Sequence, residues 1–362
     1  MRHLISTLNS PTDWVAVASY DGAETTIHGS SGATGASLPL GSFSKAVLAL
    51  AMRHDRDFIR SRITVRGEAW PVSINDLLSH HRRVGPPGVP VYAYDDERFR
   101  LAVEHYLTRH QCSVLDLPAV VADAIGMRVT LIDPVRPERG LATSPPELRH
   151  MLAMARGLVA LDPPTDDPSG HLLLGAAVST PQFRTGSPFF WSDDPTLVLQ
   201  HGGIVDRHAV LMVLAPALDR GFVLALHASD GAESGVHAQR EVSARVCCEL
   251  AIPTDPVTDR SRLHGHPDLE VDGLYSDGRD RLRICGDSTY VMVEPSDGPA
   301  RATRRIGRHA FVDVAHPAPW RYAHTFFTPS PRPDDDRHEP VIGVVLDQRS
   351  YLRQPESESV TR

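Results

Sequence analysis

The sequence predicts an α/β (α+β) protein in which an antiparallel sheet flanked by helices is followed by a small antiparallel β-barrel. A chain of 362 residues exceeds the usual size of a single hydrophobic core. Before residue 250, strand-like runs are mixed with long helical patterns, whereas the C-terminal part has only short alternating segments. We therefore expect a large domain over residues 1–252, a linker over residues 253–268 and a barrel over residues 269–356.

The first 110 residues predict a strand hairpin followed by three helices. The hairpin lies in "WVAVASYDGAETTIHGS", where Asp21-Gly22 is a typical hairpin turn. One largely buried helix is expected in "FSKAVLALAMRHDRDFI", with Ser42 at its capping position. A short helix capped by Ser73 follows in "SINDLLSHH", and a third helix in "ERFRLAVEHYLTRH".

The second half of the large domain predicts a helix, three strands and a closing helix. Ser144 and Pro145 open the fourth helix, "SPPELRHMLAMARGLVAL". Three antiparallel strands are expected in "TLVLQHGGIVDRHAVLMVLAPALDRGFVLALHASDG", with turns near Asp206 and at residues 219–221. The closing helix, "AESGVHAQREVSARVCCELA", places Val242, Val246 and Leu250 on one face.

The C-terminal part begins with a stretch rich in Pro and Asp, "IPTDPVTDRSRLHGHPDLE", which is typical of a linker. Short alternating segments follow it, and their number and length predict an antiparallel barrel. His264, His266 and Asp268 lie in the linker without a matching partner elsewhere, so we interpret them as a solvated loop rather than a metal site.

Composition narrows the classes of function. A net charge of −8 with scattered arginines disfavours nucleic acid as a partner. The first residues lack the pattern of a secretion signal, and no apolar run is long enough to cross a membrane, so we expect a cytoplasmic protein with no membrane partner. The four cysteines fit no metal-binding spacing, and no cofactor or metal is expected.

Lys45 is the single lysine among 37 basic residues. Arginine serves equally well at solvated surface positions, but only lysine loses its proton readily enough to act as a base. Ser42 lies three residues earlier, so both side chains are expected on neighbouring ridges of one helix face. The pair fits a serine nucleophile whose proton passes to lysine. The alternative is that a single lysine remains in the chain by chance.

Further motifs follow in order. These are "SFSK", "SINDLLSHH", "YAYDDERFRLAV", "ADAIGM", "LATSPPELRHML" and "QHGGIV". Together they resemble the serine β-lactamase and penicillin-binding-protein superfamily, in particular its class C β-lactamase, esterase, D-aminopeptidase and transacylase branch. The resemblance implies a β-lactamase-like sheet flanked by helices, with Ser42 as nucleophile and Lys45 as its base. The C-terminal strands resemble the lipocalin-like barrels that follow such domains in D-aminopeptidases and thioesterases.

The resemblance also implies roles for residues of the second and third motifs. Tyr92 takes the place of the Tyr in the family's Tyr-x-Asn motif, and Tyr94 replaces its Asn. His201 stands in the His/Lys-x-Gly motif, followed by Gly202 and Gly203, which permit close approach of substrate. A turn-flanking Tyr92 and a structural strand-end His201 are the alternatives. The oxyanion hole is implied to use the backbone N–H groups of Ser42 and of Ile204, which follows this motif.

The connections over residues 82–90 and 128–140 are shorter than the family's roof insertions, which predicts an open cleft. Since the chain shows no export signal, we expect an acyltransferase that passes an acyl group from Ser42 to an amine or alcohol in antibiotic or other secondary-metabolite biosynthesis. A cytoplasmic esterase or D-amino-acid amidase is the second hypothesis. A non-catalytic binding protein of the same fold is the third. The partners would be a small-molecule or peptide-like acyl donor and its acceptor.

Overall fold

The computed structural model describes residues 12–22, 24–30, 33, 35–52, 54–66, 71–78, 80–84, 89–92, 95–150, 152–153, 156, 199–215, 218–252, 268–277, 279–287, 289–305, 310–313, 323–327, 338–341, 343–346 and 349–354. These residues form two compact units. The first contains the described residues of Met1–His80, Asp95–Ser179 and Pro195–Pro253, and the second those of His81–Tyr94 and Thr254–Arg362.

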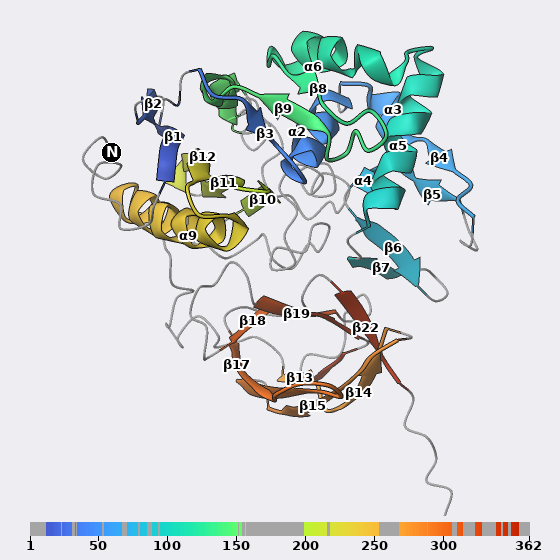
Figure 1. The fold of residues 1–362 in the computed structure, drawn as a ribbon. Helices are drawn as coiled ribbons and strands as arrows, with labels where there is room; N and C mark the ends of the chain where they lie inside the picture. Colours follow the sequence, from blue (N-terminus) through green and yellow to red (C-terminus); the bar gives the residue numbers. More distant parts are fainter. Residues whose placement is uncertain are drawn as a thin grey trace, which may run out of the picture. The chain divides into compact units, whose positions relative to one another are not determined.

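The first unit is built on a five-stranded antiparallel sheet (Figure 1). Its strand order is β10-β11-β12-β1-β2, with bounds Leu199–Val205, His208–Ala215, Arg220–Ala228, Thr12–Asp21 and Glu24–Gly29. The predicted hairpin and the three predicted strands are thus confirmed. Two segments far apart in sequence meet in the middle of the sheet, where β1 pairs with β12.

Burial along the central strands shows that the sheet is covered on both faces. Residues Trp14 to Tyr20 of β1 are buried without alternation, and β12 is nearly as continuous, which is the pattern of a strand with packing on either side. Helix α9 (Ala232–Glu249) contacts β10, β11 and β12 and covers one face (Figure 1). Val242, Val246 and Leu250 are buried as the sequence predicts.

The predicted first helix is instead two helices, α2 (Phe43–Met52) and α3 (Arg56–Arg60). The prediction of one continuous helix was wrong because Asp55 caps α3, with its Oδ1 accepting the Phe58 N–H at 2.8 Å. Every residue of α2 is buried. The helix contacts α5 (Asp96–Arg109), α6 (Leu117–Ile125) and β10.

The remaining helices of this unit surround α2. Ser73 caps α4 (Ile74–Leu78) as predicted, with its Oγ accepting the Asp76 N–H at 3.0 Å. Helix α5 (Asp96–Arg109) matches the third predicted helix, and the fourth begins with a 3₁₀ turn, η2 (Pro145–Glu147). The short elements and one further helix are β3 Leu38–Pro39, β4 Arg62–Ile63, β5 Val72–Ser73, η1 Val114–Asp116, α6 Leu117–Ile125, β8 Thr130–Leu131 and β9 Leu141–Thr143.

The second unit contains the predicted barrel, closed by eight antiparallel strands. Burial alternates along β15 and β16, so that every second side chain fills the interior, as in other small barrels. The strands are β14 Gly273–Ser276, β15 Arg281–Gly286, β16 Tyr290–Pro295, β17 Arg301–Arg305, β18 Ala310–Asp313, β19 Ala323–Phe327, β21 Gly343–Leu346 and β22 Arg349–Arg353.

Two further strand pairs belong to the second unit. Strand β13 (Asp268–Glu270) pairs in parallel with β20 (His338–Pro340). The hairpin of β6 (His81–Val84) and β7 (Val89–Tyr92) groups with the barrel, although it lies within residues 1–252 of the sequence. His264 and His266 lie outside the described residues. No helix among the described residues is long and apolar enough to span a membrane.

Candidate active site

Ser42 occupies the turn that leads directly into α2. The turn is closed by backbone hydrogen bonds, in which the Phe43 N–H donates to Leu40 and the Lys45 N–H to Ser42 itself. Gly41 has a φ of +53°, a conformation that favours glycine. The Ser42 side chain is partly exposed, whereas the neighbouring Ser44 is buried and its Oγ accepts the Leu141 N–H at 3.2 Å. Ser42 is therefore the serine of this segment that a substrate could reach.

Strand β10 lies against this turn. It is an edge strand, so only its β11 side is paired within the sheet. A Cβ placed on Gly203 would come within 2.6 Å of the Phe43 nitrogen, and one placed on Gly41 within 3.2 Å of the Ile204 oxygen. The two glycines thus allow the strand and the turn to touch backbone to backbone. Since a residue of an antiparallel strand directs its C=O and N–H to the same side, the Ile204 N–H also points to this edge.

His201 joins the strand to the nucleophile turn directly. Its Nε2 lies 3.1 Å from the carbonyl oxygen of Ser42, and its side chain is only 5% exposed. Because a carbonyl oxygen can only accept a hydrogen bond, the proton of this contact lies on Nε2 of His201. The ring packs near Phe43, with ring centroids 6.0 Å apart. The arrangement brings together four sequence-predicted residues, Ser42, His201, Gly203 and Ile204, around one contact between β10 and α2.

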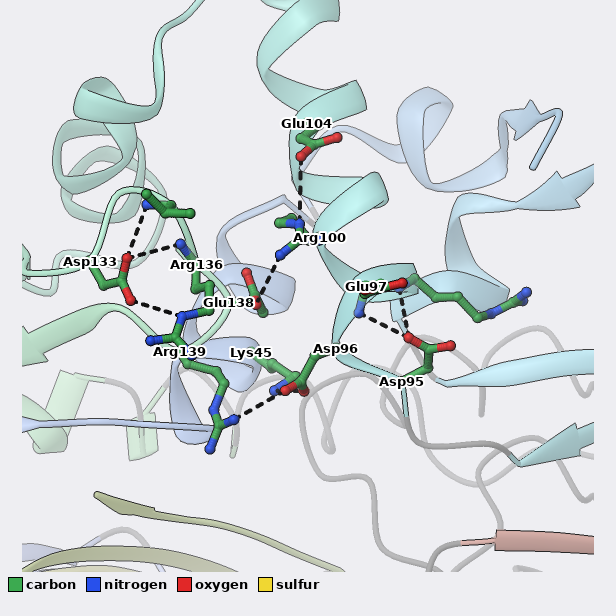
Figure 2. Close-up of polar contacts among 12 residues, drawn as sticks. Lys45, Asp95, Asp96, Glu97, Arg100, Glu104, Asp133, Arg136, Glu138 and Arg139 are labelled. Atoms are coloured by element: carbon green, nitrogen blue, oxygen red, sulfur yellow. Dashed lines mark hydrogen bonds and ion pairs between the residues drawn. The ribbon is translucent and has the colours of Figure 1, made fainter. Parts of the chain in front are cut away.

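Lys45 lies one helical turn beyond Ser42 and is fully buried, with 0% side-chain exposure. Its Nζ is 2.7 Å from Oδ1 of Asp96, which begins α5 (Figure 2). The other carboxylate oxygen of Asp96, Oδ2, is 3.4 Å from Nη1 of Arg139. The single, buried lysine of the chain therefore forms an ion pair with a partly exposed residue that the sequence analysis did not single out.

Two neighbouring residues fix the start of α5, which carries Asp96. Asp95 is the N-cap, and its Oδ1 accepts the N–H groups of Glu97 and Arg98 at 2.9 and 3.1 Å. The Asp95 N–H in turn donates to Nδ1 of His80 at 3.2 Å. His80 is buried and ends the Leu-Leu-x-His stretch. The family-like His of this stretch thus has a structural role, since it anchors the helix that presents Asp96.

The loop after β8 contributes the remaining charges. Glu138 is 1% exposed, and its Oε1 lies 4.0 Å from Nη1 of Arg100 (Figure 2). Burial raises the pKa of Glu138; nearby Arg100 and Lys45 oppose this rise, and Asp96 adds to it. Gly140 closes the loop so tightly that a Cβ would come within 2.8 Å of the Arg136 oxygen. The loop therefore holds Glu138 and Arg139 beside the Lys45–Asp96 pair.

The structure does not describe the side chains of two predicted site residues. Tyr92 is the last residue of β7, in the second unit, and its side chain lies outside the described residues, as does all of Tyr94. The signal that could have revealed Asp96 is the Asp95-Asp96 pair itself, since a helix needs one capping carboxylate and not two. No group of residues able to hold a metal ion occurs in the described part of the chain.

No known protein-family model matches the sequence, and no curated protein matches it either. Solved structures do. SurE matches with a TM-score of 0.54 and 14% identity over 97% of both chains. A structure of SurE with D-Leu matches with a TM-score of 0.51 and 15% identity over 95% of both chains. A class C β-lactamase from Rhodobacter sphaeroides has a TM-score of 0.45 and 15% identity over 67% of this chain and 97% of that one.

At such identities the likeness shows the fold. The match to SurE spans nearly the whole length of both chains. The fold class predicted from the sequence is confirmed by the antiparallel sheet with its flanking helices and by the closed barrel that follows it. The chain has the fold of the SurE structures, an antiparallel sheet with flanking helices followed by a closed barrel.

Proposed function

We propose that the chain is a serine acyltransferase that works through an acyl-Ser42 intermediate and forms an amide or ester bond in the biosynthesis of a secondary metabolite. The observation that carries the proposal is the placement of a partly exposed Ser42 one helical turn from the buried Lys45, beside β10, the edge strand of the described sheet. A nucleophile, an amine and the N–H groups of a strand edge in one place are the components of acyl transfer.

The reaction divides into two steps. Ser42 Oγ attacks the acyl carbon of the donor while its proton passes to Lys45, and the N–H groups of Ser42 and Ile204 receive the oxyanion. The bond to the leaving group then breaks, and the leaving group departs with the proton. An amine or alcohol next attacks the acyl-Ser42 carbon, loses its proton to Lys45 and releases Ser42 Oγ, which regains that proton. His201 orients the turn through the Ser42 carbonyl.

This sequence can be aligned with the Tyr-x-Asn motif in two ways. In the first register, Tyr92-Ala93-Tyr94 corresponds to the motif, and Tyr92 would pass the proton to the leaving group. In the second register, Tyr94-Asp95-Asp96 corresponds to the motif, and the Lys45–Asp96 contact supports this register. We expect Tyr94→Phe to slow acylation of Ser42 by about 10²- to 10⁴-fold, the usual contribution of a general acid or base. Tyr92→Phe is the matched control. The reverse order of effects would restore the first register.

The fate of the acyl group separates the acyltransferase from the hydrolase. An activated ester should acylate Ser42, visible as a mass increment on the intact protein, and the acyl-enzyme should persist in water. A suitable amine should then accelerate deacylation and yield an amide, because a bound nucleophile has an effective molarity that bulk water lacks. Since one SurE structure contains D-Leu, esters and amides of D-amino acids belong in the donor and acceptor panels.

The other outcomes assign the other functions. Fast hydrolysis that no amine changes would favour the esterase or amidase. Absence of acylation with every ester, in a folded protein, would favour the non-catalytic binding protein. The open cleft remains a prediction of the short connections, and a second substrate beside the acyl-enzyme depends on it.

A further inference from the structure

The single lysine is held by a carboxylate, whereas the Tyr-x-Asn pattern offers a neutral amide. Resting on the function proposed above, we propose that Asp96 is a positioning residue of this site, whose carboxylate accepts a hydrogen bond from Lys45 Nζ, holds the amine beside the nucleophile turn and stabilises the ammonium that forms when Lys45 takes the Ser42 proton. Asp96 acts through Lys45 and is not assigned a contact with the acyl donor.

The two adjacent acids at the start of α5 have separate tasks. Asp95 caps the first helical turn, since its Oδ1 accepts the N–H groups of Glu97 and Arg98 at 2.9 and 3.1 Å. Asp96 is consequently not needed as a cap, and its Oδ1 is directed at Lys45 Nζ at 2.7 Å. Its carboxylate is also well placed electrostatically, since the N-terminus of a helix favours negative charge.

Lys45 needs such a partner. Once Lys45 has taken the Ser42 proton, its fully buried ammonium is costly unless it is paired and hydrogen-bonded, and the four-carbon stem of lysine is flexible. Two described residues of the loop after β8 approach the pair: Arg139 contacts Asp96, and Glu138 lies close enough to Lys45 and Asp96 for its pKa to respond to both. Of the carboxylates in this set, Asp96 is the one with an ion pair to Lys45.

The position of Asp96 is itself fixed from two directions. On one side, His80 accepts the N–H of Asp95 and so sets where α5 begins. On the other side, Arg139 binds Oδ2, which restrains rotation of the carboxylate. Arg139 is carried by a loop that Asp133 organises, since its Oδ1 accepts the N–H groups of Val135 and Arg136 at 3.1 Å each. Figure 2 shows Lys45, Asp96, Arg139 and Asp133 with their contacts.

The test compares the same chemical change at two adjacent residues. Asp95→Asn should keep the rate constant for acylation of Ser42, because Asn caps a helix as well as Asp does. Asp96→Asn retains an oxygen that can accept from Lys45 but loses the charge, and it should slow acylation about tenfold. Asp96→Ala should slow it about 100-fold, the effect of a displacement of about 1 Å in a catalytic group. The KM for the ester should change little in any of them.

The readouts separate a positioning role from a structural one. Partial rescue by Asn relative to Ala, with a lower acylation rate and an unchanged KM, supports the proposal. A folded Asp96→Ala variant that acylates at the wild-type rate overturns it. If that variant does not fold, equal rates for Asp96→Asn and Asp95→Asn overturn it. The proposed function fails by a different result, namely no acylation of the wild-type protein or undiminished acylation of Ser42→Ala.

Discussion

Replacing Ser42 by alanine should abolish acylation of the protein by an activated ester, because the attacking oxygen is removed. The expected cost to folding is small. Loss of a serine at a helix start costs about 1 kcal/mol, and the Ser42 side chain is partly exposed. The mass increment on the intact protein measures acylation, and denaturant unfolding measures stability.

Ser44→Ala is the matched control, two residues away. Ser44 is buried, and its Oγ is the partner of the Leu141 N–H. Removing it leaves a buried donor unsatisfied, at a cost of about 1–3 kcal/mol. We therefore expect opposite effects of the two variants. Ser44→Ala should lower the free energy of unfolding more and should still be acylated. Ser42→Ala should lower it less and should not be acylated. Acylation that survives in Ser42→Ala at the wild-type rate would refute the mechanism.

Lys45→Arg should lower the acylation rate by about 10²- to 10⁴-fold, the range that general base catalysis supplies. Arginine keeps the positive charge and can still pair with Asp96, but it does not lose its proton in proteins. In the native protein, Lys45 could serve both as the base and as the ion-pair partner of Asp96. The arginine variant removes the first role and keeps the second.

The stability of Lys45→Arg must be measured alongside, because the site is fully buried and arginine is larger than lysine. Lys45→Met gives a second comparison, since the methionine side chain is similar in shape to that of lysine and has no charge. Both variants should acylate far more slowly than the wild-type protein if lysine acts as the base. A folded Lys45→Arg protein with a near-normal acylation rate would instead assign Lys45 to the ion pair alone.

Local patterns predicted much of this fold. The run from Trp14 to Tyr20 and the turn at Asp206 are short-range signals, and the structure confirms the strands they predict. The division of the first helix at Asp55 could not be predicted from apolar periodicity, because Phe58 continues the apolar pattern on the far side of the break. There the side-chain cap outweighed the periodicity.

The site was predictable in part for a related reason. Ser42 and Lys45 are three residues apart in one helix, so their proximity is local. His201 is 159 residues from Ser42, and only the motif order indicated that the two meet. Asp96 and Arg139 meet Lys45 from two other parts of the chain, and no spacing rule relates these three positions. The resemblance directed attention to Tyr92 and Tyr94 and away from the acid beside them.

The burial of the single lysine has a consequence for the dynamics of the protein. A lysine-specific endoprotease has one cleavage site in this chain, after Lys45, and that site is enclosed in α2. A protease cannot bind an intact buried helix, so cleavage requires α2 to unfold locally or with the whole domain. When opening and closing are fast relative to cleavage, the cleavage rate measures the population of the opened state. One cut therefore reports the opening free energy of the helix that begins at the nucleophile turn.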